Sequence, residues 1–211
     1  MSRALGAAAR RGAGVAMISR VPLLLVCLVS GPAVAQDGLP DHDTCMALAV
    51  AHFEGDLARS RNQASEPNFD IVSRDRVEYC GTLAIVACDR TQAPLVCQAD
   101  LAAEQEATRD AILATVPAPA DVAGLDPIWS DGLYPQLWAV AHGTSAGPDC
   151  DGADAAYRAW CVTRQASLKL GEAVALWQVA RLLGMAGSAV EAGWAGVPPP
   201  PMPVPRPGGD Q

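Results

Sequence analysis

Hydrophobic side chains recur every three to four positions along most of the chain, which is the period of an α-helix. The pattern predicts long helices from Cys45 to about Asn62, Ile71 to about Ala87, about Leu95 to Val116, and about Ala153 to Met185. A shorter helix is predicted from Tyr134 to Ala141. No segment longer than one short edge shows the alternation of a strand. The expected fold class is all-α, a small domain of four to five helices.

Short polar residues and proline mark the expected helix starts. Asp43 and Thr44 offer an N-cap for the first helix, and Asp70 offers one for the second. Such side chains accept hydrogen bonds from the free N–H groups of a first helical turn. Pro94 marks the start of the third helix, because proline fits a first turn but not a helix interior.

The aromatic residues of the chain are mostly expected in its core. The tryptophans are Trp129, Trp138, Trp160, Trp177 and Trp194. Core packing explains four of them better than an exposed carbohydrate-binding platform does. Trp194 is expected to be the most exposed. The segment 117–132 is expected to be a loop, which Ile128 and Trp129 anchor to the core.

The first 35 residues have the features of a secretory signal peptide. Residues 21–35 read VPLLLVCLVSGPAVA, after Arg20 and without an acidic residue. A basic start, a short apolar run and a small-residue ending predict cleavage before Gln36. Met17 offers an alternative start. The apolar run is too short and too broken to span a membrane, and Val26 is too large for lipid attachment at Cys27.

The remaining chain divides at its proline-rich end. Residues 36–196 are expected to form a single helical domain, since about 160 residues can enclose a core. Residues 197–211 read VPPPPMPVPRPGGDQ. Proline removes backbone donors and favours extended geometry. This segment is therefore expected to be a disordered tail.

Six cysteines remain after the signal peptide, and they are expected to form disulfides. They are Cys45, Cys80, Cys88, Cys97, Cys150 and Cys161. An even number in an exported chain indicates an oxidising destination, either the periplasm or the medium of a bacterium. No Cys-x-x-Cys pair is present, which argues against thioredoxin-type redox chemistry and c-type haem attachment. Six cysteines permit fifteen pairings, and the sequence leaves the choice open.

The chain is acidic, and loss of the signal peptide makes it more so. The full chain has 15 basic and 23 acidic residues, a formal charge of −8. Residues 1–35 contain four of the arginines and no acidic residue, so the exported form has a charge of −12. This charge opposes nucleic acid binding and favours cationic partners. Solubility alone is the alternative explanation.

The histidines do not predict a catalytic or metal site, and no cofactor is expected. Asp41-His42-Asp43 could bind a metal ion, but capping explains this run better. His52 and Glu54 are two positions apart on a helix and should point in different directions. His142 ends the short helix. No nucleophile with a positioned base is apparent, and the protein is expected not to be an enzyme.

Two patches of the chain carry a family resemblance. The first is CGTLAIVAC at 80–88 with TQAPLVCQADL at 91–101, and the second is RAWCVTRQA at 158–166. They resemble the LprI-like family of small exported helical proteins, named for lysozyme inhibition, whose pattern includes Arg-Ala-Trp-x-x-x-Arg-x-Ala. Pro94 replaces the family's Met, and Leu168 replaces a Cys. Alternatively, Cys161-Val-Thr-Arg164 resembles a later Cys-Leu-Thr-x-x-Arg segment of the family.

The resemblance implies an all-α, disulfide-linked fold and binding to lysozyme. It also implies that Trp160 is buried, that Cys97 is bridged, and that Arg158 and Arg164 bind loop carbonyls or carboxylates. The first hypothesis is therefore an exported, monomeric binding protein whose acidic surface meets a cationic protein such as lysozyme. The alternative is an envelope-associated interaction module that presents Trp194 and the proline tail to another protein.

Overall fold

The computed structural model describes residues 38–62, 71–122, 127–143, 149–152 and 154–200, all within the unit Gln36–Gln211. They form five α-helices, which are α1 (His42–Asn62), α2 (Asp75–Asp89), α3 (Pro94–Leu113), α4 (Tyr134–His142) and α5 (Ala155–Leu182). A 3-10 turn, η2 (Pro119–Val122), and a π-helical turn, η3 (Ile128–Leu133), precede α4. These described residues contain no strand. The prediction of an all-α fold with four to five helices is confirmed. The predicted signal peptide and residues 201–211 of the tail lie outside the described residues.

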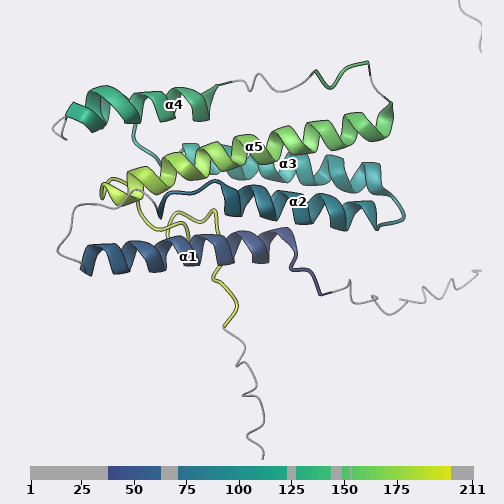
Figure 1. The fold of residues 1–211 in the computed structure, drawn as a ribbon, viewed down its shortest axis with the longest axis horizontal. Coiled ribbons are helices and arrows are strands. Elements are labelled where there is room, and N and C mark those ends of the chain that lie inside the picture. Colours follow the sequence, from purple (N-terminus) through teal and green to yellow (C-terminus); the bar gives the residue numbers. More distant parts are fainter. Residues whose placement is uncertain (1–37, 63–70, 123–126, 144–148, 153, 201–211) are drawn as a thin grey trace, which may run out of the picture. The chain divides into compact units, whose positions relative to one another are not determined.

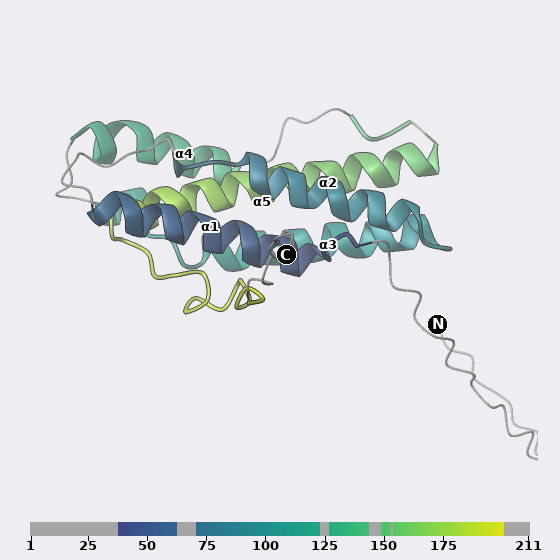
Figure 2. The same ribbon diagram turned by 60° about the horizontal axis from the view of Figure 1, so that its bottom comes forward.

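The last helix is the centre of the packing. α5 contacts α2, α3 and α4, and α1 packs against α2. Both views show α1, α2, α3 and α5 running along one common direction, with α4 beside the C-terminal half of α5 (Figures 1 and 2). Almost every residue of α5 from Leu170 to Ala180 is buried. A helical stretch that is buried on nearly all sides lies inside a protein, so the second half of α5 forms the axis of the core.

Aromatic rings fill the largest part of this core. Trp177 of α5 has no exposed surface. The rings of Phe53 and Trp194 meet it edge-on, with centroid distances of 5.2 and 4.9 Å. The indole N–H of Trp177 donates to the Gly187 carbonyl oxygen at 3.1 Å. The prediction that Trp194 is the most exposed tryptophan is therefore wrong.

A chain reversal after α5 explains the position of Trp194. Gly184 adopts a φ of +76°, a conformation that glycine tolerates best. The N–H of Met185 donates to the Ala180 carbonyl oxygen at 2.8 Å, and the N–H of Gly184 to that of Arg181 at 3.1 Å. This pair of bonds is a Schellman motif, which ends a helix and turns the chain. The turn brings residues 185–195 back onto the core.

Two other expected core residues are exposed. Trp160 retains 42% of its surface and packs only obliquely against Tyr157, which corrects the expectation of a buried Trp160. Trp160 and Tyr157 lie near the start of α5, where neighbouring elements cover the helix less than in its second half. Ile128 is 70% exposed, whereas Trp129 packs against the core. Only Trp129 therefore fulfils the predicted anchoring role for this segment.

The helix starts differ from the predicted ones for local reasons. α1 begins at His42 because the Asp41 carboxylate accepts a hydrogen bond from the Thr44 N–H at 2.7 Å. α2 begins at Asp75, four residues later than predicted. The Ser73 N–H instead donates to the Gln178 side chain of α5 at 3.0 Å, which holds this residue outside the helix. The predicted cap Asp70 lies outside the described residues.

The six cysteines form three disulfides, as predicted. Cys45–Cys80 joins α1 to α2, Cys88–Cys97 joins α2 to α3, and Cys150–Cys161 joins the segment before α5 to α5 itself. The Cα–Cα distances are 5.6, 5.4 and 5.7 Å, within the usual range for disulfides. The bridges indicate an oxidising compartment outside the cytoplasm.

Close helix contact depends on one glycine of the first patch. Gly81 of α2 faces Ser167 of α5, and a Cβ atom at Gly81 would lie 1.9 Å from the Ser167 Oγ. Two atoms that are not bonded to each other cannot lie that close together. Glycine at this position therefore allows α2 and α5 to pack directly on each other.

Candidate functional site

A groove lies where α1 begins, α2 ends and α3 begins. We call it the acidic groove and define it by Pro40, Asp41, His42, Ala84, Ala87, Cys88, Thr91, Ala93, Val96, Cys97, Asp100, Leu101 and Glu104. Its volume is about 490 Å³. These residues come from three helices and from the turn between α2 and α3, so the groove exists only in the folded chain.

The floor of the groove is apolar and shallow because its side chains are small. Ala84 and Ala87 of α2 contribute only methyl groups, and the Cys88–Cys97 bridge closes one side. Beneath it lies a small cluster of Ile85, Cys88 and Leu101. A disulfide in place of large side chains keeps the two helices together without filling the space between them.

Carboxylates surround this floor. Asp41, Asp100 and Glu104 are exposed, and none of the described residues that line the groove is a lysine or an arginine. Hydrogen bonds from the backbone N–H and the side chain of Thr44 lower the pKa of Asp41, so this carboxyl is ionised at neutral pH. The site therefore offers an apolar surface inside a negatively charged rim, a combination suited to a cationic side chain with an aliphatic stem.

Several arginine side chains contact carbonyl oxygens or carboxylates of neighbouring helices. Arg109 donates to the Ala141 carbonyl oxygen at 2.7 Å. Arg181 donates to the Glu54 carboxylate at 2.9 Å, and Arg164 lies 3.5 Å from that of Glu78. These contacts join separate helices, and they leave a surface on which carboxylates predominate.

The residues of the second family-like patch are not part of the groove. Arg164 contacts a carboxylate, in keeping with the expectation from the resemblance. Arg158 and Trp160 are exposed near the start of α5. None of the three lines the acidic groove. The first patch does contribute, since Ala84, Ala87, Cys88, Cys97 and Asp100 all belong to it.

A second, larger groove of about 870 Å³ lies between α1 and α2. Its lining includes Leu48, Tyr79 and Leu83 together with charges of both signs at Asp75 and Arg76. Arg76 lies 3.0 Å from the His52 Nε2. Mixed charge gives this groove less electrostatic preference than the acidic groove, so size alone does not decide between them.

The histidines have separate surroundings. His52 pairs with Asp56 at 2.9 Å, whereas Glu54 faces Arg181, so His52 and Glu54 point in different directions as predicted. The His142 ring stacks on Trp138 at a centroid distance of 3.8 Å, at the end of α4. His42 differs from both, because it lies in the acidic groove and faces Glu104. Nothing in the sequence pattern predicts this last contact, which joins α1 to α3.

A scan against protein-family models and searches of curated proteins and of solved structures found no match to this chain. Among the described residues, no helix has the length and apolar character needed to cross a membrane.

Proposed function

We propose that the protein is an exported, non-enzymatic binding protein of the bacterial periplasm or medium, and that its acidic groove binds a cationic segment of a partner protein. The observation that carries this proposal is the charge distribution of the groove. Three carboxylates surround an apolar floor, and no lysine or arginine is among the described residues that line it.

Lysine and arginine fit such a surface in two ways at once. Their aliphatic stems bury apolar area against Ala84, Ala87 and Val96, while their charged ends reach the rim. An arginine can also form paired hydrogen bonds with a carboxylate such as Asp100, which strengthens the contact. An anionic partner would be repelled at the same rim. The groove thus selects its partner by charge and by the apolar surface of its floor.

Lysozyme is the candidate partner that the LprI-like resemblance supplies. Residues 80–101 carry the first part of that resemblance and also form most of the α2 and α3 sides of the groove. The formal charge of −12 after signal cleavage adds long-range attraction toward a cationic enzyme. The proposed complex would block cell-wall lysis without chemistry on the inhibitor's side.

The test is a cell-wall lysis assay with chicken-type lysozyme, titrated with the oxidised protein lacking residues 1–35. We expect stoichiometric inhibition. Asp100→Lys should weaken binding about tenfold, equivalent to about 1.4 kcal/mol, because it reverses a charge on the rim. Glu106→Lys is the matched control, since Glu106 is exposed on the same helix but does not line the groove.

Three results would refute the proposal. They are an absence of inhibition at large molar excess, equal effects of the two lysine variants, and affinity that is unchanged between low and high salt. Salt screens contacts between exposed charges, so a groove that works by charge must lose affinity as salt rises. The assay contains EDTA, which removes any contribution from divalent cations.

The alternative of an envelope module loses one of its two features. Trp194 packs edge-on against Trp177, its indole nitrogen is buried and the residue is only partly exposed, so the ring offers a partner little of its surface. The proline tail would have to act alone. Deleting residues 197–211 and finding lysozyme inhibition unchanged would assign binding to the helical domain.

A further inference from the structure

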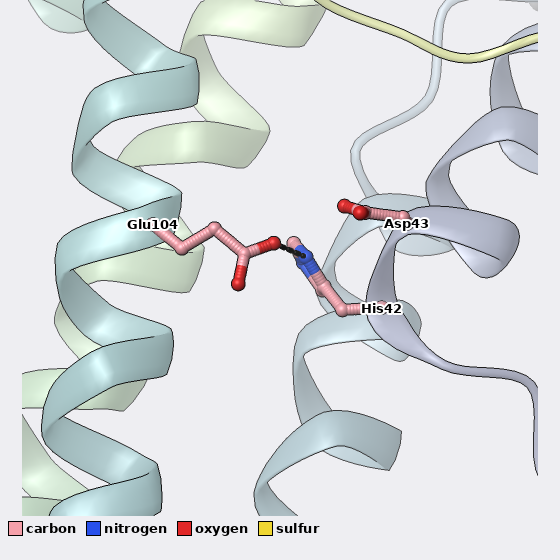
Figure 3. A group of neighbouring side chains, drawn as sticks. All are labelled: His42, Asp43 and Glu104. Atoms are coloured by element: carbon pink, nitrogen blue, oxygen red, sulfur yellow. Dashed lines mark ion pairs between the residues drawn. The ribbon is translucent and has the colours of Figure 1, made fainter.

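Three potential metal ligands meet at one end of the acidic groove. His42 and Asp43 lie in the first turn of α1, and Glu104 lies on α3. One ligand atom from each of them lies within 4.8 Å of the other two. Figure 3 shows the His42 ring and the Glu104 carboxylate pointing toward each other, with the Asp43 carboxylate close by. Glu104, which comes from a different helix, is not part of the sequence run Asp41-His42-Asp43.

The His42 ring nitrogen facing this cluster is buried and lacks a hydrogen bond. Its side chain is only 8% exposed, and its Nδ1 lies 3.5 Å from the nearer Glu104 oxygen. That separation is too long for a normal hydrogen bond, and Nδ1 has no other partner. Buried polar atoms almost always have a partner. A buried nitrogen that has no hydrogen bond and faces two carboxylates is well placed to coordinate a cation.

The geometry points to a binding site for a divalent transition-metal ion of the Zn²⁺ type, held by His42 Nδ1, the Asp43 carboxylate and the Glu104 carboxylate. Tetrahedral zinc with bonds of about 2.0–2.2 Å places its ligand atoms about 3.3–3.6 Å apart. The 3.5 Å between His42 and Glu104 already meets that requirement. Asp43 is exposed, so its side chain can rotate toward the ion. Water would complete the coordination.

The donor set favours zinc over the harder cations. Calcium and magnesium select oxygen ligands, whereas an imidazole nitrogen combined with carboxylates suits zinc and similar ions. Two carboxylates also balance the charge of a divalent ion. The site should therefore bind Zn²⁺ more tightly than Ca²⁺, and Ca²⁺ is the comparison ion in the test.

A buried residue behind His42 supports the ring. The side-chain amide nitrogen of Gln105 lies 3.4 Å from the His42 Nε2, and the Gln105 side-chain oxygen is buried without a partner. With the two ends of the amide exchanged, the Gln105 oxygen accepts a long, weak hydrogen bond from the Nε2–H. The lone pair of the ring then lies on Nδ1, toward the cluster. Metal-binding histidines are commonly oriented by such a contact.

Bound metal would supply a connection that the disulfides do not. Among the described residues, Cys45–Cys80 joins α1 to α2 and Cys88–Cys97 joins α2 to α3, but no bridge joins α1 to α3. A metal ion at His42, Asp43 and Glu104 joins those two helices directly. It would also neutralise part of the rim, so metal and a cationic partner should oppose each other in binding.

The test is isothermal titration of the oxidised, metal-free protein with Zn²⁺ in the absence of any partner. We expect one ion per chain, a higher melting temperature with Zn²⁺, and much weaker binding of Ca²⁺. Glu104→Gln should lower Zn²⁺ affinity at least tenfold, because it removes one charged ligand from an exposed position without disturbing the core. Glu106→Gln, on the same helix, should bind as the unchanged protein does.

A second readout identifies the ligand atom. The NMR signals of the His42 ring should shift on Zn²⁺ addition with the pattern of Nδ1 coordination, while those of His52 and His142 should not. An absence of binding at 0.1 mM Zn²⁺, or binding that survives Glu104→Gln and leaves the His42 signals unmoved, would overturn the proposal. Neither result bears on lysozyme inhibition, which is measured in EDTA.

Discussion

The α5-centred core and the acidic groove are built on different principles. The core contains Trp177 and Phe53, which expose little or no surface, and the partly buried Trp194, with both Phe53 and Trp194 in edge-on contact with Trp177. The groove rests on Ala84, Ala87 and the Cys88–Cys97 bridge above a small cluster. Apolar burial is the main source of stability in the first region, although it also contains the Cys45–Cys80 bridge, whereas the second has few large apolar side chains and depends on its covalent link. A protein that is cross-linked at one end can leave that end open to a partner.

The largest expected effect comes from the core. Trp177→Ala should lower the free energy of unfolding by about 3–5 kcal/mol, since it removes a fully buried ring and leaves a cavity. Val96→Ala in the groove is the comparison, and it should change stability by less than about 0.5 kcal/mol because Val96 is 62% exposed. Urea unfolding followed by circular dichroism measures both. Similar losses in the two variants would remove the distinction between core and groove.

Removal of single bridges should have the next largest effect. Replacing Cys88 and Cys97 by alanine opens a loop of sequence separation 9, and replacing Cys45 and Cys80 opens one of 35. Chain entropy predicts losses of about 3 and about 4 kcal/mol, respectively. Lysozyme binding should respond in the opposite order, because only Cys88–Cys97 lines the acidic groove. Denaturant unfolding measures the loss of stability, and titrations measure the loss of lysozyme binding. A greater loss of both in the Cys45/Cys80 variant than in the Cys88/Cys97 variant would contradict the account.

The smallest expected effect concerns Glu172, a partly buried carboxyl of α5. Burial raises its pKa, and Arg74, Arg109 and Lys169 oppose that shift only in part. A folded-state pKa above the unfolded value contributes stability at low pH that is lost as pH rises through the folded pKa. Glu172→Gln should therefore be slightly more stable than the original protein at pH 7, by less than about 1 kcal/mol. This gain should disappear on acidification. Thermal unfolding from pH 4 to pH 7 tests this, and a constant difference between the two proteins would contradict it.

The sequence predicted the local features of the fold well. Helical periodicity located the five α-helices of the described residues, and the even cysteine count predicted the bridges. Helix starts were less certain, because the start of α2 depends on a contact between Ser73 and Gln178 of α5. Trp194 was misplaced for a similar reason. Its burial requires the chain reversal at Gly184, which a helical pattern does not contain.

The candidate site was predicted only in its parts. The acidic composition predicted a negatively charged surface, and the patch 80–101 was identified as a cysteine-bearing segment. Periodicity does not show that Asp41, Asp100 and Glu104 surround one apolar floor, because the rim combines two helices that are distant in sequence. The pairing of His42 with Glu104 has the same origin. Long-range juxtaposition of this kind follows from tertiary packing.

Hydrogen–deuterium exchange of the oxidised protein, with and without saturating lysozyme, tests the central claim most directly. The account predicts slower exchange in peptides covering residues 38–46 and 84–104, which form the acidic groove, and no change across residues 170–194 of the core. Protection confined to α4 and α5, or an unchanged exchange pattern throughout, would contradict the assignment of partner binding to the groove.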